Sequence, residues 1–194
     1  MLLHAKQGSV KLLLFYQSKN RYNNLTENGE IIMHIRTATM EDLEAISAIE
    51  LACFPIKQAC TKESFRERLS VYPEHFWILE DEGKIISFVD GFCTDEPVLT
   101  DVMYEQASLH RKDGTYQMIF GVNTLPEYRK KGYASKLLRY IIEQAKMQNR
   151  KAVILTCKEE KIPFYERLGF ENQGKSVSVH GDVTWYQMIR RIDQ

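Results

Sequence analysis

FGVNTLPEYRKKGYAS, residues 120–135, is the stretch that decides the fold of this 194-residue chain. It predicts an apolar strand, a short turn with a proline, and a helix preceded by basic residues and a glycine. The first N–H groups of a helix lack intrahelical acceptors and the helix dipole adds partial positive charge, so this order favours an anion site. Arg129, Lys130 and Lys131 add full positive charges beside it. Gly132 has no side chain to hold a phosphate away from the backbone, so we predict a cofactor that carries phosphate groups.

The composition of the chain is that of an ordinary globular domain. Apolar residues make up 44% and charged residues 27%, which predicts one domain with a full-sized core. Lys+Arg and Asp+Glu both count 26, so the net charge is zero. A nucleic-acid or anionic-membrane partner would require a basic excess, and we expect neither. No apolar run reaches the roughly 18 residues of a membrane span.

The cysteines and histidines do not form a metal-binding pattern. The four cysteines, Cys53, Cys60, Cys93 and Cys157, make no C-x-x-C pair, and no histidine lies at metal-finger spacing. We therefore expect no metal site. The apolar stretch 10–16 is short and lacks a small-residue cleavage site, so we expect no signal peptide and predict free thiols in a cytoplasmic protein.

The first 32 residues differ from the rest of the chain. Residues 20–29, NRYNNLTENG, are polar and separate the stretch 10–16 from a periodic pattern that begins at Met33. Gly29-Glu30 can be encoded GGA-GAA, which resembles a bacterial ribosome-binding sequence shortly before the Met33 codon. We expect residues 1–32 to be an N-terminal extension upstream of a natural start at Met33, and residues 33–194 to be the domain. The alternative is an additional edge strand at 10–16.

Strands and helices alternate from Met33 onward, which predicts an α/β or α+β domain of three layers around a mixed sheet. A capping box at Thr39 and an N-cap at Thr61 begin the first two helices. The predicted strands are 33–37, 75–79, 84–92, 116–124, 151–157, 175–180 and 183–190, the last two as a hairpin around Gly181-Asp182. The predicted later helices are 132–149 and 162–168.

Two motifs together carry a family resemblance. Arg129-Lys130-Lys131-Gly132-Tyr133-Ala134 lacks the Gly-Lys-Ser/Thr of a nucleotide P-loop and the three glycines of a dinucleotide fingerprint. It resembles motif A of the GCN5-related N-acetyltransferases (GNAT), an Arg/Gln-x-x-Gly-x-Gly/Ala signature. PFYERLGF, residues 163–170, resembles the family's FYxxxGF element, and the resemblance covers residues 33–190. It implies the GNAT acyl-CoA N-acyltransferase fold, a mixed central sheet with helices on both faces.

The resemblance also implies acetyl-CoA as cosubstrate and assigns residues to it. The backbone of 122–124 would pair with the pantetheine arm like an added strand. The N–H groups that follow would hold the pyrophosphate. The implied cofactor-binding residues are Val122, Asn123, Thr124, Arg129, Lys130, Lys131, Gly132, Tyr133, Ala134 and Ser135.

The implied reaction is direct attack of a free amine on the thioester. An alkyl ammonium has a pKa of about 10, so about one amine in a thousand is neutral at pH 7, and a general base would help. Tyr165 stands at the position of the family's general-acid tyrosine, which protonates the departing thiolate. Among the acids Glu96 and Asp90, at the end of the second predicted hairpin, we rank Glu96 ahead as the base.

The acceptor is less constrained by the sequence. PFYERLGF favours the arylalkylamine N-acetyltransferase-like branch. Members of that branch commonly carry two histidines on the strand before motif A, and this chain has Met118 and Phe120 at those positions. The acidic, aromatic segment 94–116 resembles a lid over a small molecule, so we predict a small primary amine as substrate and allow for a homodimer. Two alternatives are a non-catalytic acyl-CoA-binding or sensor module and a protein-lysine or N-terminal acetyltransferase.

Overall fold

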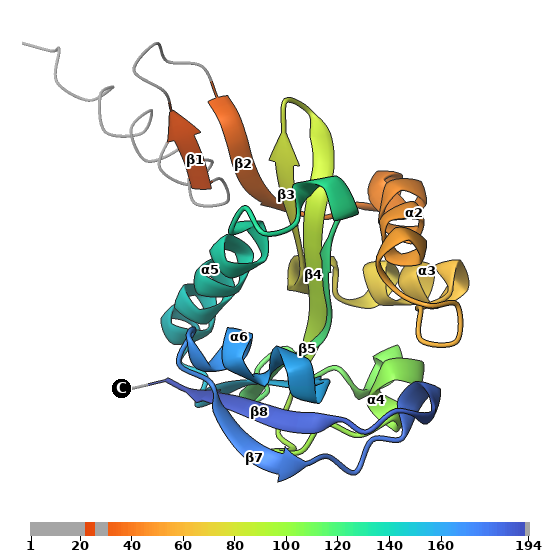
Figure 1. Ribbon diagram of the computed structural model, residues 1–194, viewed down its shortest axis with the longest axis vertical. Coiled ribbons are helices and arrows are strands. Elements are labelled where there is room, and N and C mark those ends of the chain that lie inside the picture. The colour runs from red at the N-terminus through yellow and green to blue at the C-terminus, as the bar shows by residue number, and fades with distance from the viewer. Residues whose placement is uncertain (1–21, 26–30, 193–194) are drawn as a thin grey trace, which may run out of the picture.

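An eight-stranded sheet forms the centre of the computed structural model, which describes residues 22–25 and 31–192 (Figure 1). The strand order is β1-β2-β3-β4-β5-β6-β8-β7. Within the described residues, β5 and β6 form the one parallel pair, and the other neighbours are antiparallel. The strands are β1 Tyr22–Leu25, β2 Ile31–Thr37, β3 Phe76–Asp81, β4 Lys84–Thr94, β5 Tyr116–Thr124, β6 Ala152–Cys157, β7 Glu171–Lys175 and β8 Tyr186–Arg191.

Helices cover both faces of the sheet. In Figure 1, α5 and α6 lie on one side and α2 and α3 on the other. The α-helices are α2 Leu43–Cys53, α3 Lys62–Val71, α4 Val102–Glu105, α5 Tyr133–Met147 and α6 Ile162–Glu166. Short 3-10 turns are η1 Met40–Asp42, η2 Pro73–His75, η3 Ala107–Leu109, η4 Pro126–Tyr128, η5 Glu159–Lys161 and η6 His180–Asp182. One buried cluster includes residues of α5 and another residues of α2 and α3, which confirms the predicted α/β fold.

The two predicted helix caps are present. The Thr39 N–H donates to Asp42 Oδ2 at 2.8 Å, which closes the capping box at the start of η1 and α2. The Ser64 N–H donates to Thr61 Oγ1 at 3.1 Å at the start of α3. These bonds satisfy backbone donors that a helix start leaves unpaired, which explains why both helices begin where the sequence indicated.

A β-bulge bends β5 in its middle. Asp90 pairs with Gly121 and Gly91 with Ile119, so Phe120 is an additional residue on β5. A Cβ at Gly91 would lie 1.8 Å from the Met118 carbonyl oxygen, so only glycine fits there. Because a bulge increases local twist and bends its strand, the end of β5 turns away from its neighbour β6.

The last hairpin differs from the prediction. Strands were expected at 175–180 and 183–190, but the pairing uses β7 Glu171–Lys175 and β8 Tyr186–Arg191. Residues 176–185 form a connection instead, because side chains hold it elsewhere: the Val179 N–H donates to Asp101 Oδ2 at 3.0 Å, and Trp185 Nε1 donates to the His180 carbonyl at 2.8 Å. The alternating valines of this connection are exposed, so their pattern was a misleading strand signal.

Only some of the predictions for the amino-terminal residues fall within the described part of the chain. The alternative edge strand at 10–16 lies outside the described residues. The short strand β1 pairs antiparallel with β2. Among the described residues, the search for a helix of the length and hydropathy that a membrane crossing requires finds none.

Candidate active site

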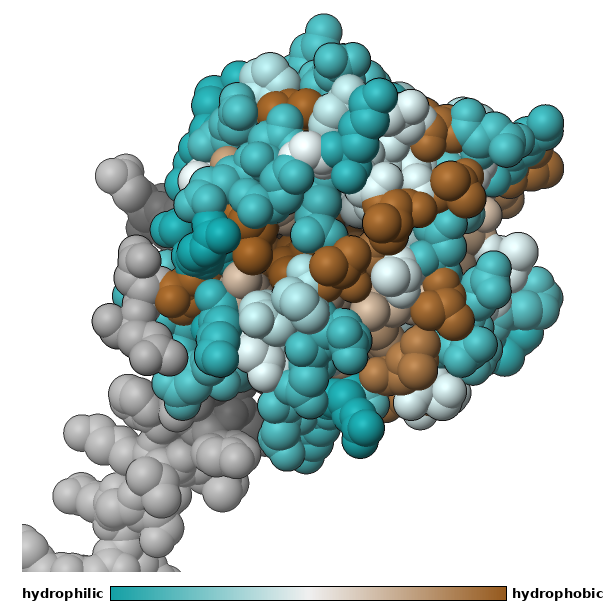
Figure 2. Space-filling model, turned by 90° about the horizontal axis from the view of Figure 1, so that it is seen from below, coloured by the Kyte–Doolittle hydropathy of each residue, from teal (hydrophilic) through white to brown (hydrophobic). Residues whose placement is uncertain are grey.

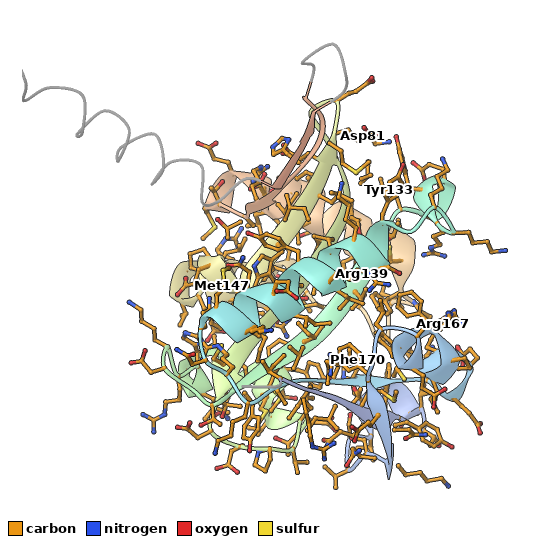
Figure 3. The ribbon with its side chains drawn as sticks, turned by 90° about the vertical axis from the view of Figure 1, so that its left-hand side faces the viewer. Asp81, Tyr133, Arg139, Met147, Arg167 and Phe170 are labelled. Carbon is orange, nitrogen blue, oxygen red and sulfur yellow. The ribbon has the colours of Figure 1, made fainter. Side chains whose placement is uncertain are left out.

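A cationic pocket opens at the amino-terminal end of α5. Its volume is about 690 Å³, and four of its lining side chains, Arg129, Lys130, Arg139 and Arg167, carry positive charge. In Figure 3, Tyr133 and Arg139 project from α5 and Arg167 lies beside it, after α6. The other lining residues are Thr124, Tyr128, Gly132, Tyr133, Ala134, Ser135, Phe164 and Leu168. No carboxylate is among these residues, so the pocket suits an anionic group.

The backbone at the base of the pocket is shaped for close approach. Gly132 is the N-cap of α5 with a φ of 86°, and Lys130 has a φ of 62°. Because the first bond of the helix runs from the Lys136 N–H to the Gly132 carbonyl, the N–H groups of residues 132–135 have no acceptor within the helix. A Cβ at Gly132 would meet no atom within 4 Å, so the space above these donors is open.

The carboxyl-terminal half of β5 presents a free edge toward β6. The parallel pairing covers residues from Tyr116, opposite Ala152, to Ile119, opposite Leu155, and does not continue in the described chain. Beyond that point β5 stays paired with β4 and β6 with β8. No strand of the described chain therefore pairs with residues 120–124 on this side. The edge leads to Thr124 in the wall of the cationic pocket, where the Thr124 carbonyl accepts from Arg129 Nε at 3.1 Å.

Most of the predicted cofactor-binding residues lie together. Seven of them line the pocket: Thr124, Arg129, Lys130, Gly132, Tyr133, Ala134 and Ser135. Lys131 lies over the ring of Tyr128, with its Nζ 5.2 Å from the ring centroid. Val122 and Asn123 belong to the free edge but point to opposite faces of the sheet, Val122 toward the core under α5 and Asn123 into the α2 side, where it is fully buried.

Tyr165 lies in α6 next to the end of β6. Its ring contacts Phe164 and Phe170 at centroid distances of 5.0 and 5.7 Å. Burial raises the pKa of its hydroxyl above the ordinary value, and the neighbouring Cys157 raises it further. The phenol therefore keeps its proton at neutral pH, which is the state that a general acid requires.

Aromatic rings form a wall on the α2 and α3 side of β5, here called the acceptor wall: Phe92, Tyr104, Phe120 and His180. The Phe120 ring lies 4.9 Å from Phe92 and 5.0 Å from Tyr104, and Tyr104 stacks on His180 at 5.5 Å between centroids. The Arg68 guanidinium lies 4.9 Å from the Phe120 centroid. Phe92 is fully buried, whereas Tyr104, Phe120 and His180 are partly exposed and form the accessible part of this wall.

The structure does not bring Glu96 to the motif. Glu96 lies two residues past the end of β4. That end pairs with the start of β5, Thr94 with Tyr116, whereas Val122 near the end of β5 pairs with Val89. At about 3.3 Å per residue, Glu96 is roughly 20 Å from Val122. Its exposed side chain stands at the opposite end of the strand pair. Asp90, the other acid considered, is buried and paired with Arg68 at 2.8 Å.

Glu50, a carboxylate of α2, was not predicted as a site residue from the sequence. It is only 4% exposed and lies on the helix face that buries Leu43, Ile46 and Ile49. Its Oε1 accepts the Cys60 N–H at 2.9 Å. Burial, the largest cause, raises its pKa to about 7. The available signal was its spacing, because an acid at an apolar position of an amphipathic helix is a buried charge.

A separate polar cluster lies at the other end of the sheet. Single ligand atoms of Glu74, His75 and His110 lie within 4.8 Å of one another. His110 Nδ1 accepts the Cys93 N–H at 3.2 Å, which places the proton of the neutral ring on Nε2. His75 Nδ1 lies 2.8 Å from Gln117 Oε1, whose amide group donates to the Phe92 and Met118 carbonyls. These bonds describe a structural network that orients both rings.

Comparison with known proteins places most of the chain in one family. The model of the acetyltransferase (GNAT) family matches residues 43–170. Serotonin N-acetyltransferase of Mesocricetus auratus is 26% identical over 157 residues, which cover 79% of this chain and 74% of that protein.

Two solved structures share the fold. The loading GNATL domain of CurA from Lyngbya majuscula has a TM-score of 0.73 and 17% identity over 82% of this chain and 97% of its own. The GphF GNAT-like decarboxylase, solved with isobutyryl-CoA, has a TM-score of 0.68 and 20% identity over 81% of this chain and 98% of its own.

Proposed function

Because the chain belongs to the GNAT family of acetyltransferases, we propose that it transfers an acetyl group from acetyl-CoA to the primary amine of a small molecule. The observation that carries the proposal is the free edge of β5, which leads from the acceptor wall to the cationic pocket. A peptide-like arm can pair with such an edge while its phosphates bind at a helix start. The related GphF structure binds a CoA thioester on the same fold.

The residues present fit acetyl-CoA. The N–H groups of residues 132–135 and the side chains of Arg129 and Lys130 would hold the pyrophosphate. Arg139 and Arg167 would supply further charge to the remaining phosphate. The backbone of Val122, Asn123 and Thr124 would pair with the pantetheine amides. Lys131 would contribute charge from beside Tyr128.

Tyr165 is the general acid of this proposal. Bound acetyl-CoA supplies a thioester carbonyl for the amine to attack and a thiolate as leaving group. The Tyr165 hydroxyl, kept protonated by burial, donates its proton to that leaving sulfur. Its place beside Cys157, where β6 ends and β5 has already separated, is compatible with this role.

We propose an apolar amine of the arylalkylamine type as acceptor. Serotonin N-acetyltransferase is named for such an amine, and the acceptor wall offers aromatic surface for one. Four exposed valines add apolar surface: Val98 before α4, Val102 at its start, and Val177 and Val179 on the connection 176–185. Figure 2, which views the molecule from below, shows hydrophobic groups among the hydrophilic ones on that face.

The stacking of Tyr104 on His180 favours a small acceptor over a protein. Asp101 accepts bonds from Ser178 Oγ and the Val179 N–H, which fixes the connection 176–185 against α4. This contact closes a side on which a peptide substrate would require an open groove. The alternative of a protein-lysine or N-terminal acetyltransferase therefore has less support.

The test is thiol release from acetyl-CoA over a panel of arylalkylamines, polyamines, amino acids and a lysine peptide. We expect amine-dependent release that is fastest with an arylalkylamine. Release at the rate of hydrolysis with every amine, together with tight CoA binding, would instead support the non-catalytic acyl-CoA-binding module. Fastest release with the lysine peptide would favour the protein acetyltransferase.

Three further expectations belong to this proposal. Residues 33–194 form the N-acetyltransferase domain. The protein works in the cytoplasm, in keeping with four free cysteines. A homodimer stays a prediction, which gel filtration with light scattering would test.

A further inference from the structure

The buried side-chain atoms without a hydrogen-bond partner gather in one region. Among the described residues they belong to Glu50 on α2, Gln58 on the connection from α2 to α3, Tyr72 after α3, and Asn123 on β5. Glu50 and Asn123 account for three of them: Glu50 Oε2, Asn123 Oδ1 and Asn123 Nδ2. Buried polar atoms are nearly always paired, so exceptions beside an active site indicate a bound water or a functional role.

Glu50 faces the carboxyl-terminal half of β5. Cys53, one turn further along the same face of α2, lies with its Sγ 3.3 Å from the Thr124 carbonyl oxygen, a contact that ties α2 to this half of β5. Oε1 of Glu50 is held by the Cys60 N–H, which leaves Oε2 free. The carboxylate is thus oriented by one oxygen, while the other is buried next to Asn123 without a hydrogen bond of normal geometry.

The side chains of Asp90 and Asn123 fill the space beside Gly121. A Cβ at Gly121 would lie 2.7 Å from Asp90 Oδ1 and 3.1 Å from Asn123 Nδ2. Asn123, which is fully buried, therefore presents its amide group to the same face as the missing Gly121 side chain. A water beside Asn123 would find both a donor and an acceptor there.

The other charges around Glu50 neutralise one another. Arg68 of α3 and Asp90 of β4 form an ion pair of 2.8 Å in which both side chains are buried. The remaining titratable neighbours are Cys53 of α2 and Cys60 of the α2–α3 connection, and burial raises the pKa of both thiols. Glu50 is therefore the carboxylate of this cluster that has no direct ion-pair partner among the described residues.

We propose that Glu50 is the general base of the reaction and that its free Oε2 accepts the proton of the acceptor amine, directly or through one water held by Asn123. The inference rests on the proposed function. Glu50 first takes one proton from the ammonium form of the acceptor, which frees the nitrogen lone pair. As the N–C bond then forms and the C–S bond breaks, the sulfur gains a proton from Tyr165 and the nitrogen gives its second proton to water. Glu50 then releases its proton to solvent and Tyr165 takes one up, which restores the starting state.

The test compares Glu50→Gln with the wild type on two amines. With an alkylamine at pH 7.5, we expect kcat to fall by roughly 10²–10³-fold while the Kd of acetyl-CoA stays unchanged. In the wild type kcat should rise with pH as the Glu50 carboxyl group loses its proton, and this rise should be absent from Glu50→Gln. With an amine whose own pKa is below the assay pH, and which is therefore already neutral, the loss should be less than about tenfold.

Glu44→Gln is the matched control, because Glu44 lies on the same helix but is exposed and pairs with Lys62 at the surface. It should keep wild-type kcat. A readout that needs no turnover is the infrared carboxyl band of the free protein. A carboxyl group that titrates near neutral pH should be present in the wild type and in Glu44→Gln, and absent from Glu50→Gln.

Two results would overturn the proposal while leaving the acetyltransferase activity intact. One is a Glu50→Gln protein with wild-type kcat and pH profile. The other is an equal loss with both amines accompanied by weaker acetyl-CoA binding, which would show a structural role. By contrast, a wild-type protein without amine-dependent thiol release would contradict the proposed function itself.

Discussion

Burial displaces two ionisable side chains of this site in the same direction, with opposite consequences for catalysis. The pKa of Tyr165 is raised, so the phenol keeps the proton that a leaving thiolate needs. The pKa of Glu50 is raised to about 7, so the carboxylate becomes a stronger base without ceasing to be ionised near neutral pH. In the proposed mechanism, one physical cause would thus prepare Tyr165 as the acid and Glu50 as the base.

Tyr165→Phe removes the proposed proton donor and keeps the ring that packs on Phe164 and Phe170. We expect kcat to fall roughly 100-fold, with an unchanged Kd for acetyl-CoA, because only the leaving sulfur loses its acid. Steady-state thiol release and calorimetric titration measure the two quantities. Turnover at the wild-type rate would remove Tyr165 from the mechanism.

Glu50 should also reduce the stability of the folded protein. The pKa of Glu50 is about 7 in the fold against an ordinary glutamate value of 4.5, so between these pH values the unfolded chain releases the proton first. The free energy of unfolding therefore falls as the pH rises from about 4.5 to 7, by up to about 3 kcal/mol, and is constant above.

Glu50→Gln should accordingly be more stable than the wild type at pH 8, by up to about 3 kcal/mol, and close to it at pH 4.5. Urea unfolding at the two pH values gives the difference. Glu44→Gln should follow the wild type at both. A Glu50→Gln protein that is less stable at pH 8 would show that the carboxylate is well compensated in the fold.

At the scale of elements, the start of α5 depends on a left-handed glycine. Gly132→Val places a β-branched residue at a φ of 86°, which costs about 1–2 kcal/mol, and its side chain would cover the free N–H groups. We expect acetyl-CoA affinity to fall by more than about tenfold, beyond what the strain explains.

Gly174→Val is the control for that strain. Gly174 has a φ of 89°, and a Cβ there would meet no atom within 4 Å, but it lies in the exposed strand β7. It should lose similar stability, measured by urea unfolding, and keep its affinity for acetyl-CoA. Equal losses of affinity in the two variants would mean that Gly132 acts through stability alone.

The sequence was sufficient where local chemistry determines an element. The Thr39 and Thr61 caps, the apolar strand β6 and the glycine-led start of α5 were all predicted. The prediction failed where a contact with a residue distant in the sequence determines the local structure. Asp101 holds the connection 176–185 away from the sheet, and no local pattern shows that contact.

The same limit applies to the catalytic residues. Glu96 follows a strand that reaches the site, but the register of β4 on β5 places it at the far end. Glu50 is remote from both motifs in sequence, and only packing of α2 on β5 brings it near Asn123. Sequence spacing reports neighbours along one element, whereas an acid and a base here come from different layers.

For the whole molecule, we predict that a chain starting at Met33 folds and binds acetyl-CoA. The described part of the extension comprises β1, which pairs with β2, and the first two residues of β2 itself. The core clusters are formed by later residues. The truncated protein should keep its kcat and unfold at nearly the same urea concentration. Loss of soluble protein on truncation would instead make the extension part of the fold.

We expect the open edge of β5 to make the lifetime of this protein depend on its cosubstrate. Unpaired strand edges are templates for association between chains, and a ligand that fills one shields it. A cosubstrate at about 100 times its Kd would stabilise the fold by about 2.7 kcal/mol, which a melting curve with and without CoA would show. Cells poor in coenzyme A would then hold a form that proteases and aggregation remove sooner, so the abundance of the enzyme would follow the supply of its own acyl donor.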